Sequence, residues 1–359
     1  TVNLLKNGTK VDSKTVTPDA SGAWTYSFSG LDKYNADGTE ITYTVSEDPV
    51  DGYTSTVTGT NITNSYTPET TVVKVTKAWV GPKTNSVTVH LLADGTDTGK
   101  IIALDEAANW TGTFSNLPKY KDGTAITYTV KEDDIANYTN AITGDAITGF
   151  TITNTNTEKV NVPVKKEWIG PKAGPVTVHL LADGADTGKT LTLDEAGSWK
   201  DSFDGLKKYN DDGTEIVYTV KEDDITNYTS TTTGDATTGF MITNTNTEKV
   251  DVSVTKKWVG PKAGPVTVHL LADGTDTGKT VTLSDANSWT DTFSGLDKYK
   301  TDGTEIVYSI KEDEISGYTS KITGDATTGF TITNTEVPHD TPKPKEDTPK
   351  KSNRKPAKK

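Results

Sequence analysis

The sequence predicts an all-β protein composed of tandem immunoglobulin-like β-sandwiches arranged as an elongated rod. Short segments alternate apolar and polar residues with a period of two, and no segment shows a helical period. Turn signals such as Gly81-Pro82 and Asp94-Gly95 separate these segments. The pattern also recurs along the chain, so that Asn154, Asn244 and Asn334 follow one another at intervals of 90 residues. A repeat of this length suits one sandwich of about seven strands.

The recurring segments divide the chain into repeats. The sequence Val-Thr-Val-His-Leu-Leu-Ala-Asp-Gly begins at Val87 and recurs from Val176 and Val266, with a looser copy from Val2. The joints between repeats are short, which predicts a stiff rod. We number the complete repeats 1 (67–156), 2 (157–246) and 3 (247–336), and we call residues 1–66 the partial repeat because they lack a first strand.

The last residues, 337–359, differ from the repeats. They are rich in Pro and Lys and show no apolar periodicity. Such a composition cannot bury enough apolar surface to offset the entropy of ordering the chain. The sequence therefore predicts a disordered tail.

Composition excludes several classes of function. With 50 acidic residues against 37 basic ones, the net charge of −13 argues against nucleic acid or an anionic membrane as a partner. The absence of cysteine rules out disulfides and cysteine-based metal sites. No stretch is long and apolar enough to cross a membrane. Because the chain starts at Thr1 without a charged n-region or an apolar h-region, we expect no signal peptide in it. It has no initiator Met and begins inside a repeat, so we expect a fragment or a processed piece of a longer protein.

Strand parity places charged residues on the inner faces of the repeats. In repeat 1, Lys77 has the same parity as Val75, which belongs to an apolar alternation. By the same count, Glu132 and Asn154 share the faces of the apolar residues that precede them. The equivalent residues are Lys166, Glu222 and Asn244 in repeat 2, and Lys256, Glu312 and Asn334 in repeat 3.

These three residue types permit a reaction with one another. A charged side chain in a core is costly unless it is paired or chemically consumed. Burial lowers the pKa of a lysine and favours the neutral acid of a glutamate. Lys77 is then the nucleophile, Glu132 the general acid/base and Asn154 the electrophile, and the product is an isopeptide bond formed with loss of ammonia. Because each set reacts once, the protein is not an enzyme in the usual sense.

The predicted cross-links join the first strand of each repeat to the last. In repeat 1 the bond closes a loop of 77 residues, which the chain-entropy model for disulfides converts to about 4–5 kcal/mol of stability. Tension that enters one terminal strand and leaves by the other then bypasses most of the fold. The predicted pairs are Lys77–Asn154, Lys166–Asn244 and Lys256–Asn334, with Glu132, Glu222 and Glu312 as the catalytic residues.

The partial repeat holds an incomplete site. It retains Glu47 and Asn64 at the positions of the glutamate and the asparagine. The strand that would carry the lysine is missing, so we predict no bond there.

The same residues lie in motifs that resemble the Cna B-type domains of Gram-positive surface adhesins. The motifs are Lys-x-Trp at 77–79, Tyr-Thr-Val-Lys-Glu at 128–132 followed by Asn137-Tyr138, and Phe-Thr-Ile-Thr-Asn-Thr at 150–155. The resemblance covers residues 1 to about 336. It implies an inverse immunoglobulin-like (prealbumin-like) sandwich, an intramolecular Lys–Asn bond assisted by an acidic residue, and a stalk that presents a separate ligand-binding region at the surface of a Gram-positive bacterium. We expect the rod to be monomeric. A host matrix protein would bind a region outside this chain.

Two other functions stay open. The sandwich faces or loops could contact a host matrix protein directly, and a large exposed apolar or aromatic groove would then be expected. A backbone-pilin role is the second, because residues 47–53 resemble the E-box of sortase-assembled pilins, although the chain has no pilin lysine motif and no LPxTG signal. The sequence holds no Ser/His/Asp set, metal cluster or phosphate loop, so we expect no cofactor and no metal.

Other conspicuous residues have simpler interpretations. Three histidines have outward parity and are far apart, which favours a solvated face over a metal site: His90, His179 and His269. Asp94, Asp97 and the run 210–213 do not fit EF-hand spacing and are explained as turn residues. The tryptophans of the recurring Trp–Phe pairs are predicted to be core residues: Trp24, Trp110, Trp199 and Trp289.

Overall fold

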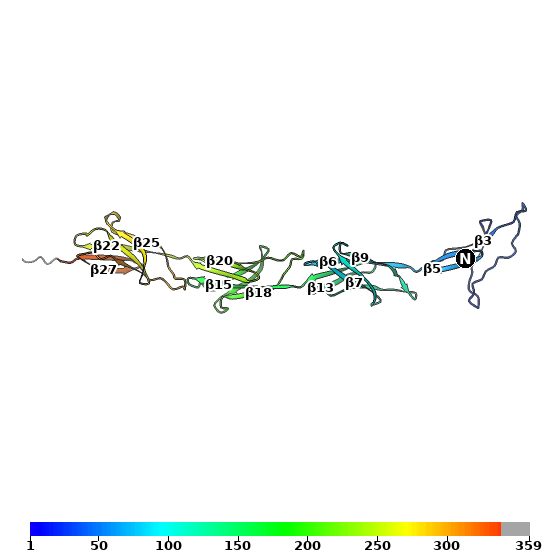
Figure 1. The fold of residues 1–359 in the computed structure, drawn as a ribbon, viewed down its shortest axis with the longest axis horizontal. Coiled ribbons are helices and arrows are strands. Elements are labelled where there is room, and N and C mark those ends of the chain that lie inside the picture. Colours follow the sequence, from blue (N-terminus) through cyan, green and yellow to red (C-terminus); the bar gives the residue numbers. More distant parts are fainter. Residues whose placement is uncertain (339–359) are drawn as a thin grey trace, which may run out of the picture. The chain divides into compact units, whose positions relative to one another are not determined.

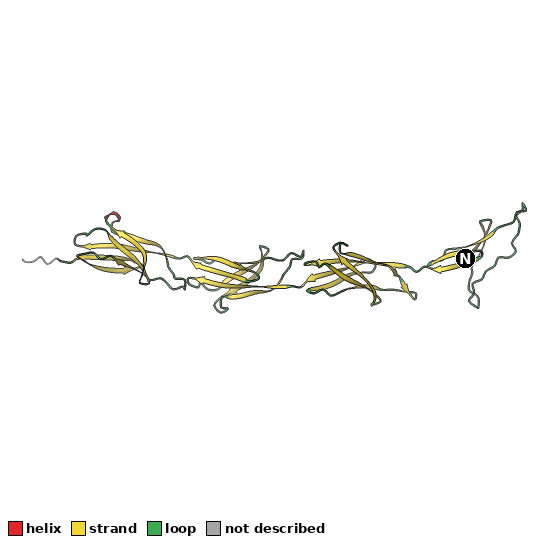
Figure 2. Ribbon diagram, in the orientation of Figure 1, coloured by secondary structure: helices red, strands yellow, loops and turns green. Residues whose placement is uncertain are grey.

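The computed structural model describes residues 1–338 and is almost entirely β-structure (Figures 1 and 2). A single-turn 3₁₀ helix, η1 (Asp285–Asn287), is the helical element of the described part and is red in Figure 2. The chain forms two compact units. One comprises Thr1–Lys159 with Lys207–Glu215, and the other comprises Val160–Leu206 with the residues from Ile216 onward. From residue 339 on, the predicted tail lies outside the described residues.

Repeat 1 is a sandwich of two sheets. A four-stranded sheet has the order β13-β14-β6-β9, and a three-stranded sheet has the order β12-β7-β8. A small hairpin, β10–β11, joins β9 to β12. The bounds are β6 (Thr70–Val80), β7 (Ser86–Ala93), β8 (Thr96–Asp105), β9 (Thr111–Pro118), β10 (Tyr120–Lys121), β11 (Thr124–Ala125), β12 (Tyr128–Glu132), β13 (Tyr138–Asp145) and β14 (Gly149–Asn156).

Repeats 2 and 3 contain the same two sheets. Their orders are β18-β15-β21-β20 with β17-β16-β19, and β25-β22-β28-β27 with β24-β23-β26. In repeat 2 the strands are β15 (Lys159–Ile169), β16 (Val176–Ala182), β17 (Ala185–Leu193), β18 (Lys200–Lys207), β19 (Tyr218–Glu222), β20 (Tyr228–Asp235) and β21 (Gly239–Asn246). In repeat 3 they are β22 (Lys249–Val259), β23 (Val266–Ala272), β24 (Thr275–Leu283), β25 (Thr290–Asp297), β26 (Tyr308–Glu312), β27 (Tyr318–Asp325) and β28 (Gly329–Glu336). The prediction of seven-stranded sandwiches is confirmed.

The first and last strands of each repeat are parallel neighbours. In repeat 1, β6 and β14 pair in a register that sets Lys77 opposite Ile152. In repeat 2, β15 and β21 set Lys166 opposite Ile242. Repeat 3 repeats this register between β22 and β28. The asparagine lies two residues beyond the lysine's partner, and therefore on the same face of the sheet.

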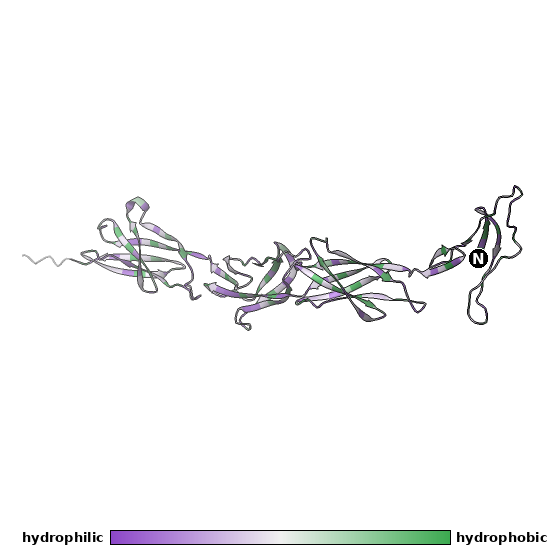
Figure 3. Ribbon diagram, turned by 45° about the vertical axis from the view of Figure 1, so that its right-hand side comes forward, coloured by the Kyte–Doolittle hydropathy of each residue, from purple (hydrophilic) through white to green (hydrophobic). Residues whose placement is uncertain are grey.

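The core of each sandwich follows from period-two alternation. Green and purple alternate along the strands in Figure 3. In repeat 1 the two sheets bury Val75, Leu91 and Ile152 almost completely, and each of the other two complete repeats has an equivalent cluster. Charged side chains that share the inner faces are therefore enclosed by aliphatic and aromatic groups.

The partial repeat has an open core. Its strands are β1 (Val2–Lys6), β2 (Thr9–Lys14) and β3 (Tyr43–Glu47) in one sheet, with β4 (Tyr53–Thr58) and β5 (Asn61–Tyr66) as a separate pair. The prediction that Trp24 belongs to the core is wrong, because 66% of this residue is exposed. In repeat 1, β9 is held by pairing with β6. The segment around Trp24 has no such first strand to pair with.

Candidate functional site

Strands from both sheets supply the lysine, glutamate and asparagine of each site. In repeat 1, Lys77 is on β6 and Asn154 is on the adjacent β14, while Glu132 ends β12 in the facing sheet. All nine residues of the three sites are buried, with at most 8% of any residue exposed. Strand parity predicted this inward orientation. Lys165 and Lys257, which neighbour the buried lysines of repeats 2 and 3, are exposed.

Each buried lysine lies beside its glutamate. The Nζ–Oε1 distance is 3.2 Å for Lys77 and Glu132, 3.0 Å in repeat 2 and 2.6 Å in repeat 3. These contacts are short enough for ion pairs, yet the lysine nitrogens and those Oε1 atoms make no hydrogen bond of good geometry. The side-chain oxygen of Asn154, and of its two equivalents, also has no hydrogen-bond partner. Buried polar atoms left in this state cost stability, so the arrangement is not explained by stability.

Burial changes the acidity of the lysines. Removal from water lowers the pKa of Lys77 below its ordinary value, and the nearby Glu132 carboxylate only partly opposes the effect. The pKa values of Lys166 and Lys256 are lowered for the same reason. A lower pKa raises the fraction of each lysine that is the neutral amine, which is the nucleophilic form.

Aromatic rings close the site on one side. The Nζ atom of Lys77 lies 4.2 Å from the ring centroid of Trp79, and the corresponding distances in repeats 2 and 3 are 4.4 and 4.6 Å. Trp79 makes edge contacts with Trp110 and Tyr138 at 5.2 and 5.4 Å between centroids. Phe114 is also buried in this core. The rings exclude water from the amine.

The glutamate has one environment in repeat 1 and another in repeats 2 and 3. Ser230 donates its hydroxyl proton to Glu222 at 3.2 Å, and Ser320 does the same to Glu312 at 3.0 Å. In repeat 1 the equivalent residue is Asn140, and neither carboxylate oxygen of Glu132 has a hydrogen-bond partner. The carboxyl group of repeat 1 is therefore the least restrained of the three.

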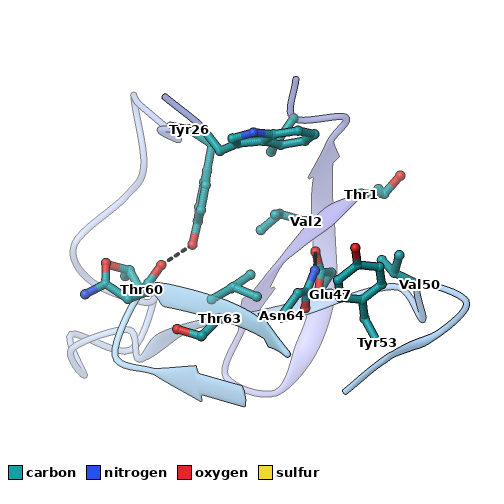
Figure 4. A pocket seen from close by; sticks show the side chains of 13 residues that line it. Thr1, Val2, Tyr26, Glu47, Val50, Tyr53, Thr60, Thr63 and Asn64 are labelled. Carbon is teal, nitrogen blue, oxygen red and sulfur yellow. Dashed lines mark hydrogen bonds between the residues drawn. The ribbon is translucent and has the colours of Figure 1, made fainter. Parts of the chain in front are cut away.

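The partial repeat brings Glu47 and Asn64 together (Figure 4). The Nδ2 atom of Asn64 donates to Oε1 of Glu47 at 3.1 Å, while the buried Oε2 of Glu47 has no partner. Both residues line an open groove of about 870 Å³, together with Val2 and Tyr53. No lysine lines this groove.

The histidines have partners that the sequence analysis missed. His90 on β7 contacts Asp97 on β8 at 2.9 Å through Nδ1, and Asp133 after β12 at 3.1 Å through Nε2. His179 and His269 repeat this bridge with distances of 3.0–3.2 Å. Each imidazole ties together three strands on the outer face of one sheet. The sequence contains a signal for this contact, because the partial repeat lacks both partners at once. Asn3 stands in the position of His90, and Lys10 stands in the position of Asp97.

The acidic turns have local explanations. Oδ1 of Asp97 accepts from the backbone of Gly99 at 2.7 Å, and Oδ1 of Asp212 accepts from the backbone and hydroxyl of Thr214. Residues 1–338 contain no group of three or more His, Cys, Asp or Glu residues arranged to hold a metal ion. The same residues include no helix with the length and apolar character needed to span a bilayer.

The fold and the buried sites define a class: tandem β-sandwich repeats with a lysine, a glutamate and an asparagine enclosed in each complete core. The family model of the Cna protein B-type domain matches residues 1–65, 73–155, 162–245 and 252–335. The chain therefore belongs to the Cna protein B-type domain family.

The chain is similar to one curated relative and to two solved structures. A collagen adhesin of Staphylococcus aureus is 36% identical over 362 residues, covering 95% of this chain but only 30% of the relative. The crystal structure of two B repeat units (B1B2) of the collagen-binding protein of Staphylococcus aureus is 35% identical, with a TM-score of 0.39, and covers 94% of this chain and 93% of that chain. The single B1 unit is 31% identical, with a TM-score of 0.25, and covers 50% of this chain and 100% of its own.

Proposed function

We propose that this chain is a structural stalk region of a bacterial surface adhesin, in which each complete repeat is closed by an autocatalytic Lys–Asn isopeptide bond. One observation carries the proposal. Three separate cores each enclose a lysine beside a glutamate, on the same face as an asparagine whose oxygen is unpaired. A merely stabilising role would require the polar atoms to be satisfied.

The reaction uses groups that each repeat already contains. In repeat 1 the neutral Nζ of Lys77 attacks Cγ of Asn154 and forms a carbon–nitrogen bond. The protonated Glu132 donates to the asparagine oxygen and stabilises the tetrahedral intermediate. The glutamate then moves a proton from the attacking nitrogen to the departing amino group, which leaves as ammonia. Atoms balance as one amine and one primary amide giving one secondary amide and ammonia, without a cofactor.

The strand geometry gives the bond a mechanical role. The chain enters repeat 2 at the start of β15 and leaves it at the end of β21, and these strands are parallel neighbours. A Lys166–Asn244 bond places residues 167–243 outside the path of tension. The proposed load path then contains only the ends of two strands.

We propose the location of this chain and its partner from the similar protein. The similar protein is a collagen adhesin, and this chain spans less than a third of its length. We place this chain outside the cell, at the wall of a Gram-positive bacterium. A host matrix protein such as collagen would be bound by a region outside the chain, and the repeats would present that region.

Peptide mapping of the purified chain tests the proposal. After digestion, each bond predicts a branched peptide that joins the segment around the lysine to the segment around the asparagine. Lys166→Ala should abolish the branched peptide of repeat 2 and leave those of repeats 1 and 3. Lys165→Ala is the matched control, because Lys165 is the exposed neighbour on the same strand.

Glu222→Gln tests the role of the glutamate separately. The change keeps the size of the side chain but removes its acid. We expect unlinked Lys166 and Asn244 peptides from repeat 2 only. Normal cross-linking in Glu222→Gln would disprove the general acid/base role, and linear peptides from the unmodified chain would disprove the bond itself.

A further inference from the structure

A loop of repeat 3 contacts a turn of repeat 2 within one compact unit. The backbone N–H of Gly170 donates to the carbonyl oxygen of Thr301 at 3.1 Å. Gly303 in the same loop has φ +88°, and a Cβ atom there would lie 2.9 Å from both the Gly170 oxygen and the Pro171 Cα. Because these are backbone atoms, a side chain at 303 could not be accommodated by rotating a neighbour. The close approach therefore depends on glycine.

The same contact occurs in the other unit. The backbone N–H of Gly81 donates to the carbonyl oxygen of Asp211 at 3.0 Å. Gly213 has φ +92°, and a Cβ atom there would lie 2.9 Å from the Cα of Pro82. Two loops thus meet two Gly-Pro turns with the same donor, the same acceptor position and the same glycine. Because the same contact occurs in both compact units, we interpret it as a specific feature of the repeats.

Each turn is held firmly by its own repeat. The Tyr228 hydroxyl donates to the carbonyl oxygen of Pro171, and the Tyr228 ring packs edge-on against Trp168 at 5.2 Å. Gly170 itself lies against the end of β21, where an added Cβ would meet that of Asn246 at 2.6 Å. The Gly170-Pro171 turn is therefore a fixed surface.

The linker between repeats 2 and 3 contacts the start of the same loop. The Oδ1 atom of Asn246 accepts from the Glu248 backbone at 2.9 Å. Glu248 in turn accepts from the Lys298 backbone at 3.1 Å and pairs with the Lys298 ammonium at 3.4 Å. Asn156, Glu158 and Lys208 form the corresponding contacts in the other unit.

Repeat 1 shows what a loop without this contact looks like. Its loop has one residue fewer than the loops of repeats 2 and 3, so Thr301 has no counterpart. The shorter loop closes as a hairpin through Asp122 and Gly123, both at positive φ. A Cβ atom added at Gly123 would meet nothing within 4 Å.

We propose that residues 298–305 and 208–215 form docking loops, whose partner is the Gly-Pro turn of the preceding repeat. Docking fixes the orientation of repeat 3 on repeat 2 through one backbone hydrogen bond and one glycine contact. The extra residue, Thr301 or Asp211, makes each loop long enough to contact that turn. This surface needs no isopeptide bond, so its test is independent of the cross-link.

Distance measurement by pulsed electron spin resonance tests docking in the full chain. Because the chain has no cysteine, Thr190→Cys and Thr280→Cys introduce unique labelling sites on exposed positions of β17 and β24. We expect one narrow distance distribution for the labelled parent. Gly303→Ala should broaden it about twofold or more, because undocked neighbouring domains move by default.

Two further variants keep the result interpretable. Gly274→Ala is the matched control, since Gly274 has a similar φ of +81° in the same repeat with open space around it. It should leave the distribution narrow. Deletion of Thr301 gives the natural loop length of repeat 1, avoids the steric clash and should broaden the distribution as Gly303→Ala does. A parent distribution as broad as that of the deletion variant, or equal broadening in Gly274→Ala, would overturn the proposal.

Discussion

The lysines are the residues in which the chemistry of this protein is most visible. A buried ion pair seldom stabilises a fold more than an apolar pair of the same size. Here the same costly arrangement occurs in three cores, with side-chain exposures of the lysines and glutamates between 0 and 3%. Removal from water lowers each lysine's pKa, which is the direction that the proposed attack by the neutral amine requires.

At the residue scale, we predict that stability depends on pH in a variant that cannot form the bond. In Asn244→Ala, Lys166 stays a free amine whose folded-state pKa lies below the ordinary 10.5. Between the folded pKa and 10.5 the unfolded state holds more protons, so the stability of repeat 2 should rise with pH across that interval. Thermal unfolding from neutral to alkaline pH measures this rise. The double variant Asn244→Ala/Lys166→Met should lack it, and identical pH profiles in the two variants would contradict the account.

At the scale of elements, the parallel pairing of first and last strands decides what a cross-link can do. Pulling apart the start of β15 and the end of β21 shears two neighbouring strands, and loads their hydrogen bonds together. The proposed isopeptide bond between these strands would carry the load covalently instead. Its main effect would therefore be on mechanical stability.

Single-molecule stretching of the full chain tests this element-scale claim. We expect repeats 1 to 3 to show no unfolding step that releases a whole repeat. Glu132→Gln should add one such step, because repeat 1 then unfolds completely. The control is Lys165→Ala, whose trace should match that of the parent. A parent chain that releases three whole repeats under load would refute the mechanical role.

Local pattern predicted much of the fold and of the buried sites. Alternation along β6, β12 and β14 is enough to assign the inward faces, and with them Lys77, Glu132 and Asn154. Other contacts could not be predicted from local pattern, because they depend on strand order or loop geometry. The His90 bridge needs three neighbouring strands, and exposure of Trp24 needs the absence of a pairing partner. The docking of Gly303 depends on one extra loop residue and a contact with another repeat.

At the scale of the whole molecule, the repeats share one design but differ in detail. Repeats 2 and 3 have a serine that donates to the glutamate, whereas in repeat 1 neither glutamate oxygen has a hydrogen-bond partner. The partial repeat has no lysine in its groove. The account therefore predicts three bonds in the chain and none in the partial repeat. The docking loops would add order between adjacent repeats without changing that number.

The intact mass of the purified chain tests the central claim most directly. Each isopeptide bond removes one ammonia, so the account predicts a mass lower than the sequence mass by three ammonia molecules. The triple variant Glu132→Gln/Glu222→Gln/Glu312→Gln should restore the full mass of its own sequence. A parent chain at its full sequence mass would contradict the account.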